Sequence, residues 1–166
     1  IRLQGQTNMG NDYISIMAQS LQKKLGVLDG IIEKNVEQRQ ILEQEELDAD
    51  AFEQNIKLKS DLVDQIEFLD EGFEELYGRV KSLMETEKQQ HKEEIQLMKQ
   101  LIKEITEKSV TIQTQEARNR KLVEQRFSQE RKKVRSMRNT STVANQYYKN
   151  MSKLNVVDAQ FMDKKK

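Results

Sequence analysis

The sequence contains no proline, and residues 31–166 contain only two glycines, Gly72 and Gly78. Proline and glycine are the residues that most often interrupt helices, so long helices are possible over most of this 166-residue chain. Only 36% of the residues are hydrophobic, and the mean hydropathy is -0.86. Such a polar chain does not suit a thick core, but it suits long, thin helices. We therefore expect an elongated all-α fold.

Apolar residues in the first half of the chain recur every three or four positions, which is the spacing of a helix with one buried face. The first stripe lies within residues 13–46 and consists of Ile14, Met17, Leu21, Leu25, Leu28 and Ile32. The second consists of Phe52, Ile56, Val63, Ile66, Leu69, Phe73, Leu76, Val80 and Leu83 or Met84. Asn35 and Arg39 lie near the first seam, which should pack less tightly there, and Lys59 interrupts the second.

Two chain reversals are expected. The stretch ELDADAF offers Asp48 and Asp50 as helix N-caps, which predicts a turn near Leu47. Residues 85–94 contain no apolar side chain, which predicts the second reversal. Because this stretch contains no helix breaker, one continuous helix over residues 50–138 remains an alternative.

A third stripe follows the second reversal and suggests a helix that runs to about Arg138. Its apolar members are Ile95, Met98, Ile102, Ile105, Ile112, Val123 and Phe127, and Ser109, Glu116 and Asn119 dilute it. With two reversals, the expected fold is an antiparallel three-helix bundle with coiled-coil-like packing. Its helices should span about residues 13–46, 49–85 and 90–138, after a disordered leader of residues 1–12 and before a mobile C-terminal tail of residues 139–166.

Charges are sorted along the chain, although the net charge is zero. Residues 33–75 hold 15 acidic and 4 basic side chains, whereas residues 118–166 hold 14 basic and 4 acidic ones. A basic segment can bind nucleic acid, but antiparallel packing would place the acidic residues 43–50 near the basic residues 118–135. We therefore expect the two blocks to cover each other, and we do not expect nucleic acid as a partner.

Enzymatic chemistry finds little support in the sequence. The single histidine, His91, lies in the most polar stretch and is expected to be exposed to solvent. No phosphate-binding loop, zinc-protease motif or calcium-loop spacing is present, and there is no cysteine. We therefore expect no catalytic residue, no cofactor and no metal. No apolar window is long enough for a membrane span, and the first residues lack the apolar core of a signal peptide, so a cytoplasmic location without membrane insertion is expected.

The C-terminal tail carries the main candidate binding site. After the polar stretch NTST, apolar residues recur at Val143, Tyr147, Met151 and Leu154, which predicts a short amphipathic helix. This segment has more apolar surface than a solubilising tail needs. The residues expected to bind a partner are Val143, Tyr147, Tyr148, Met151, Leu154, Val157 and Phe161 in the tail, with Ile112, Val123 and Phe127 on the third helix. Docking onto the chain's own bundle and docking onto a partner both remain open, and the two can alternate.

The stretch from Leu21 to Asp70, with its leucine-patterned helix, acidic turn LDAD and second helix with spaced Lys and Leu, resembles the FlgN-type flagellar export chaperones. The tail NQYYKNM…VDAQFMDKKK is similar to the ends of some chains of that family. The resemblance implies a cytosolic chaperone that binds C-terminal helical segments of hook-filament junction proteins and delivers them to the type III export apparatus. A structural coiled-coil or scaffold protein is the alternative, and a helical nucleic-acid-binding protein is a more distant one.

Overall fold

The computed structural model describes the backbone of residues 2–130 and 140–151, and the side chains in those ranges from residue 12 onward. Within these ranges the chain forms four helices and no strand, which confirms the all-α helical-bundle prediction. The three long helices are α1 (Arg2–Glu43), α2 (Ala49–Thr86) and α3 (Lys92–Gln129). The 42 residues of α1 correspond to about 63 Å of helix at 1.5 Å per residue. The fourth helix is short and covers residues 140–151.

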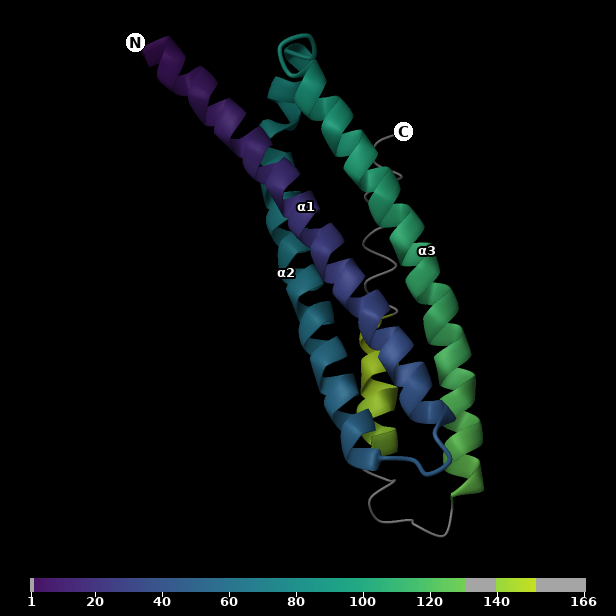
Figure 1. The fold of residues 1–166 in the computed structure, drawn as a ribbon. Helices are drawn as coiled ribbons and strands as arrows, with labels where there is room; N and C mark the ends of the chain where they lie inside the picture. The colour runs from purple at the N-terminus through teal and green to yellow at the C-terminus, as the bar shows by residue number, and fades with distance from the viewer. Residues whose placement is uncertain (1, 131–139, 152–166) are drawn as a thin grey trace.

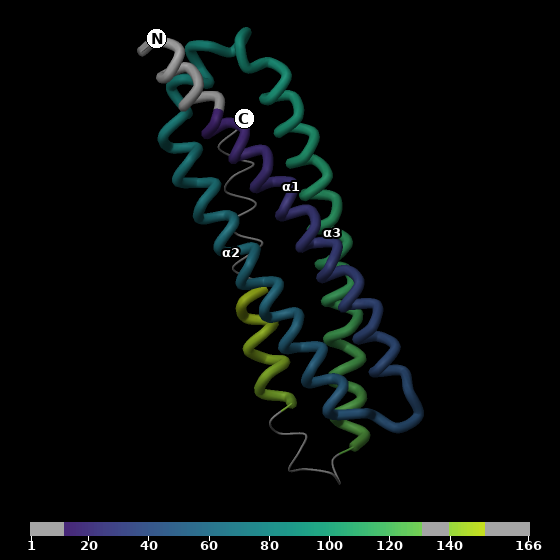
Figure 2. Tube along the Cα trace, turned by 60° about the vertical axis from the view of Figure 1, so that its left-hand side comes forward, coloured from purple at the N-terminus to yellow at the C-terminus, as the bar shows by residue number. Residues whose placement is uncertain are grey.

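The bundle is organised around α1, which packs along both α2 and α3 (Figure 1). The two outer helices are joined by long side chains, such as Phe52 and Phe127, whose ring centroids lie 5.7 Å apart in an edge-to-face arrangement. The short helix of residues 140–151 lies between α2 and α3 in Figure 1, and Figure 2 shows it running beside α2. The short helix lies in the predicted tail, where the sequence predicted an amphipathic helix and left open whether it docks on the bundle or on a partner.

The first reversal occurs where the acidic turn predicted it. Asp48 is the N-cap of α2, and its side-chain Oδ1 accepts a hydrogen bond from the backbone N–H of Ala51 at 3.0 Å. This bond satisfies one of the amide groups that a helix leaves unpaired at its start, and Asp50 adds a negative charge in the first turn. The turn prediction near Leu47 is confirmed.

The second reversal separates α2 from α3 at residues 87–91, as the apolar gap predicted, and the continuous-helix alternative is wrong. The prediction for His91 is also wrong, because its side chain is only 2% exposed. The imidazole Nε2 lies 3.4 Å from a carboxylate oxygen of Glu87. The neighbouring Lys88, Gln89 and Gln90 are exposed, so within this five-residue reversal the burial is particular to His91, which directly precedes α3.

The apolar stripes of the three long helices face one another and form one continuous core. Two ion pairs link α1 to its neighbours. Lys24 binds Asp70 on α2, with Nζ and Oδ1 2.8 Å apart, and both side chains are largely buried. Lys108 on α3 binds Asp29, and this pair is more exposed to solvent. The expected pairing of the acidic and basic blocks takes a different form. Arg126 reaches Glu45, but it donates to the backbone carbonyl oxygen at 2.6 Å and not to the carboxylate.

The ends of the helices differ from the sequence prediction. Helix α1 begins at Arg2, so the segment expected to be a disordered leader is helical from that residue. The third helix is described to Gln129, and the expected extension to Arg138 lies outside the described residues. Leu154, Val157 and Phe161 lie outside them as well. Among the described helices, none is long and apolar enough to cross a membrane.

Candidate helix-binding face

The C-terminal helix of residues 140–151 covers one face of the bundle, which we call the tail-binding face. Its residues Ala144, Tyr147 and Met151 are buried, while Val143 and Tyr148 are partly buried against the same core. Four of these five residues, all except Ala144, are the described members of the predicted tail site, and the five repeat at steps of three and four along the helix. The amphipathic helix expected from the sequence therefore forms, and its apolar side packs on the chain's own bundle.

Tyr147 is the central contact of the tail-binding face. Its hydroxyl donates a hydrogen bond to Oε1 of Glu116 on α3 at 2.6 Å, and its side chain is 1% exposed. The Nζ atom of Lys59 on α2 lies 4.3 Å from the centre of the same ring, which is a cation–π contact. One tyrosine thus joins both outer helices.

Lys59 and Glu116 form a buried ion pair beneath Tyr147. Lys59 Nζ lies 2.9 Å from Glu116 Oε1, and the two side chains are 0% and 9% exposed. A buried charge is costly unless it is paired and hydrogen-bonded. Lys59 meets this requirement with a second hydrogen bond, which its Nζ donates to Gln38 Oε1 at 3.2 Å. Oε2 of Glu116, in contrast, is buried without a hydrogen-bond partner among the described residues.

Amide side chains extend this cluster across α1. Gln38 donates to Asn55 Oδ1 at 3.1 Å and accepts from Asn119 Nδ2 at 3.1 Å, so one glutamine of α1 links α2 and α3. Asn119 also donates to the backbone oxygen of Asn35, and Asn55 donates to that of Lys34, both at 2.9 Å. We call this cluster the polar layer; its members are Asn35, Gln38, Asn55, Lys59, Glu116 and Asn119.

Burial at the polar layer and the face above it shifts the pKa values of Lys59, Tyr147 and Tyr148. Burial lowers the pKa of Lys59, and the Glu116 carboxylate opposes that shift. Burial raises the pKa of Tyr147, and the nearby Glu116 charge raises it further. Burial also raises the pKa of Tyr148, whose ring packs edge-to-face on that of Tyr147, with centroids 5.5 Å apart. Both phenols therefore keep their protons at neutral pH, so the Tyr147 hydroxyl remains a hydrogen-bond donor.

The predicted binding residues of α3 are part of the core. Ile112 and Val123 are buried, and Phe127 packs against Phe52. They flank Glu116 and Asn119 at steps of three and four, so the α3 stripe continues on either side of the polar layer. In the described chain, the tail residues and the α3 residues named from the sequence therefore belong to one packed arrangement.

The sequence predicts single polar residues in the apolar stripes, but it does not predict that they form one polar layer. Asn35, Lys59, Glu116 and Asn119 were each noticed as an interruption of an apolar stripe, and Gln38 and Asn55 were not singled out. The available signal was that Lys59 and Glu116 occupy facing positions once α2 and α3 run antiparallel. Arg39 was expected near the seam, but it is exposed and pairs with Glu43, one turn further along α1.

The polar layer and the face above it hold a helix in this structure. Among the described residues, no three His, Asp or Glu side chains are grouped as metal ligands would be. Comparisons with protein-family models, with curated proteins and with solved structures found no match to this chain. Functional conclusions therefore depend on the geometry of the tail-binding face and on the sequence itself.

Proposed function

We propose that this chain is a helix-binding chaperone that holds an amphipathic helix of a client protein on the tail-binding face, in exchange for its own residues 140–151. The observation that carries the proposal is the docked Tyr147, which contacts Glu116 on α3 and Lys59 on α2. This contact indicates that the face accepts an amphipathic helix. Helix-in-groove binding of this kind is a common mode of peptide recognition.

Exchange is energetically reasonable because the helix of residues 140–151 makes only a small apolar contact. Its two large buried side chains are Tyr147 and Met151, each worth about 1.5–3 kcal/mol when fully buried. Ordering the segment on the bundle takes back a large part of that energy. A client helix that presents similar side chains can therefore compete with the tail.

The family resemblance makes this proposal more specific. We propose that the client is the C-terminal helical segment of a hook-filament junction protein, and that the chain acts in the cytoplasm as a FlgN-type export chaperone. The resemblance of residues 21–70 and of the tail supports this assignment. The buried polar layer adds a requirement on the client, because a helix that covers the Lys59–Glu116 pair in place of the tail must again offer it a hydrogen-bonding side chain, as Tyr147 does.

The test is a calorimetric titration of the full chain with a peptide that comprises the C-terminal helical segment of a hook-filament junction protein. In Tyr147→Ala the tail no longer competes for the face, so we expect the client peptide to bind at least about tenfold more tightly. Lys149→Ala is the matched control, because this side chain lies on the same helix but is exposed, and it should leave the affinity unchanged.

Each other outcome has a defined meaning. A tenfold loss of affinity in Tyr147→Ala would mean that the tail itself contacts the client, and an unchanged affinity would place the client elsewhere. Binding of a scrambled peptide as tightly as the junction-protein peptide would refute the flagellar assignment but not helix binding. A permanent dimer in sedimentation equilibrium, with no peptide binding, would favour the scaffold alternative.

A further inference from the structure

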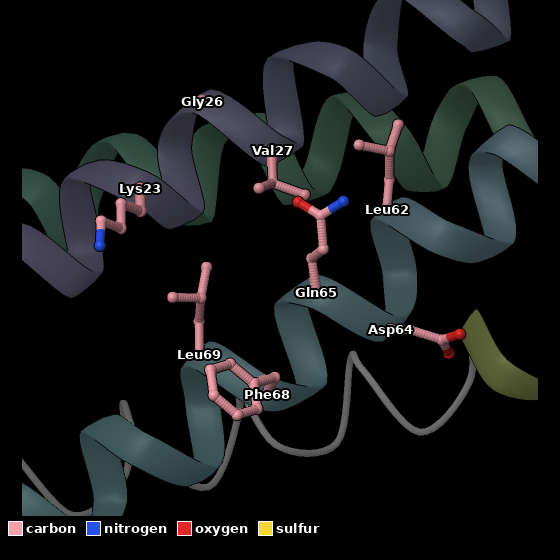
Figure 3. A pocket seen from close by; sticks show the side chains of 8 residues that line it. All are labelled: Lys23, Gly26, Val27, Leu62, Asp64, Gln65, Phe68 and Leu69. Atoms are coloured by element: carbon pink, nitrogen blue, oxygen red, sulfur yellow. The ribbon is translucent and has the colours of Figure 1, made fainter.

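A second surface lies between α1 and α2. The two helices form a groove of about 670 Å³, which we call the α1–α2 groove. It is lined by Lys23, Gly26, Val27, Leu62, Asp64, Gln65, Phe68 and Leu69. Figure 3 shows Val27, Leu62 and Leu69 facing the space between the helices, and Phe68 at its edge on α2.

Phe68 is the most exposed large apolar side chain among the described residues, at 76% of its surface. Single exposed apolar residues are ordinary on protein surfaces, but Phe68 adjoins an apolar groove. Val27, Leu62 and Leu69 line the groove next to it. An exposed aromatic side chain beside an apolar groove is typical of an interaction site.

Gly26 and Gly30, one turn apart on α1, make the wall of the groove shallow. A glycine inside a helix costs roughly 1 kcal/mol relative to alanine, so it usually has a packing reason. An added Cβ on Gly30 would make an ordinary van der Waals contact with Leu62, 3.4 Å away. For Gly26 no packing reason is found among the described residues, because an added Cβ would meet no atom within 4 Å. Close approach of a second helix would supply the missing reason.

The charges on α2 indicate which kind of partner helix can bind in the α1–α2 groove. Residues 60–78 contain seven acidic side chains and no lysine or arginine. Asp61, Asp64 and Glu71 are exposed, and they precede or follow Phe68 at helical spacing on its own face. Lys23 is the basic residue of the groove lining. The rim on the α2 side is therefore negative, and it complements lysine and arginine side chains of a partner.

From these observations we propose that the α1–α2 groove docks a basic amphipathic helix of a partner protein, with Phe68 as the anchor and the acidic rim of α2 as the source of specificity. The partner helix presents an apolar stripe to Val27, Leu62 and Leu69 and carries its positive charges beside that stripe. No residue of the C-terminal helix or of the polar layer lines this groove, so the client helix and this second helix would contact different residues.

The test uses the full ¹⁵N-labelled chain and a synthetic helical peptide of about 18 residues, in which leucines repeat at helical spacing and the other positions are lysine or glutamine. In NMR titrations the largest shift changes are expected at residues 23–30 and 62–69. A second peptide in which glutamate replaces lysine should bind at least about tenfold more weakly, because it meets the acidic rim with like charge.

Three variants separate binding from folding. Phe68→Ala should weaken the lysine peptide at least about tenfold and leave the melting temperature unchanged, because the side chain is mostly exposed. Gly26→Leu should also weaken the peptide by filling the groove, but it should raise the melting temperature, because leucine favours helix over glycine. Val110→Ala is the control, since Val110 is an exposed apolar residue on α3, and it should change neither quantity.

Four results would overturn the proposal. These are equal binding of the lysine and glutamate peptides, unchanged binding to Phe68→Ala, shift changes centred on residues 140–151, and absence of peptide binding. If the last result is accompanied by a dimer that Phe68→Ala abolishes, the occupant of the groove is a second copy of this chain.

Discussion

Removing one member of the Lys59–Glu116 pair should destabilise the chain far more than its exposed ion pairs would suggest. Both side chains are buried, and their charged atoms lie 2.9 Å apart. Loss of one partner from a buried pair costs about 3–5 kcal/mol, because it leaves the other charge without compensation. The loss of stability in Glu116→Leu should lie at the lower end of this range, because burial lowers the pKa of Lys59, which can then release its proton.

Replacing both members should recover much of that loss. In Lys59→Met with Glu116→Leu no charge is buried, and Gln38 Oε1 still accepts from Asn119. The main remaining defect is the Tyr147 hydroxyl, which loses its acceptor at a cost of about 1–3 kcal/mol. The single losses sum to about 6–8 kcal/mol and the double variant should lose only about 1–3 kcal/mol, so the cycle should show a coupling free energy of at least about 3 kcal/mol, the upper limit usual for contacting residues.

Urea unfolding of the four proteins, followed by circular dichroism, measures this coupling. The matched control is the exposed pair of Arg39 and Glu43, whose charged atoms lie 2.7 Å apart; its coupling should not exceed about 0.5 kcal/mol. If the effects of the Lys59 and Glu116 substitutions add within about 0.5 kcal/mol, the reasoning about the polar layer is refuted.

Three further predictions concern charge and capping. Burial raises the pKa of Tyr147, and the Glu116 charge adds to the shift. Above pH about 10 the folded chain therefore keeps a proton that the unfolded chain loses, so the free energy of unfolding should fall as the pH rises. Urea unfolding at successive pH values measures this slope, which Tyr147→Phe should flatten. Asp48→Ala removes the N-cap of α2 and should cost about 1 kcal/mol in thermal unfolding; no change would contradict the capping role. Duplex DNA should bind more weakly than about 10 µM at physiological salt, because Arg120 and Arg126 are held by Glu124, Tyr148 and Glu45; tight binding with a steep salt dependence in a fluorescence titration would contradict this.

The reversals of the chain could be predicted because their signals are local. Asp48 caps a helix through a bond to a residue three positions away, and the apolar gap at residues 85–94 removes the reason for α2 to continue as a packed helix. The exposure of His91 could not be predicted in the same way. It depends on how this one side chain is packed in the fold, which the composition of the stretch does not determine.

The polar layer could be predicted only in fragments. Helical periodicity indicates which face of a helix is buried, but it does not indicate which element covers that face. Lys59 and Glu116 look like defects in their own stripes, and they become a pair only because α2 and α3 run antiparallel on either side of α1. The same limit applies to the tail, since the spacing of Val143, Tyr147 and Met151 predicted docking without indicating whether the bundle or a partner would be covered.

The central claim is that a client helix replaces residues 140–151 on the tail-binding face. The most direct measurement is the distance between spin labels at positions 57 and 149, both of which are exposed in the described chain. Because packed helices lie about 8–10 Å apart, the labels should be within about 25 Å of each other in the free chain. With a saturating amount of client peptide, we predict that this short distance is replaced by longer and broader ones. An unchanged distance distribution, under conditions where calorimetry shows the peptide bound, would contradict the exchange.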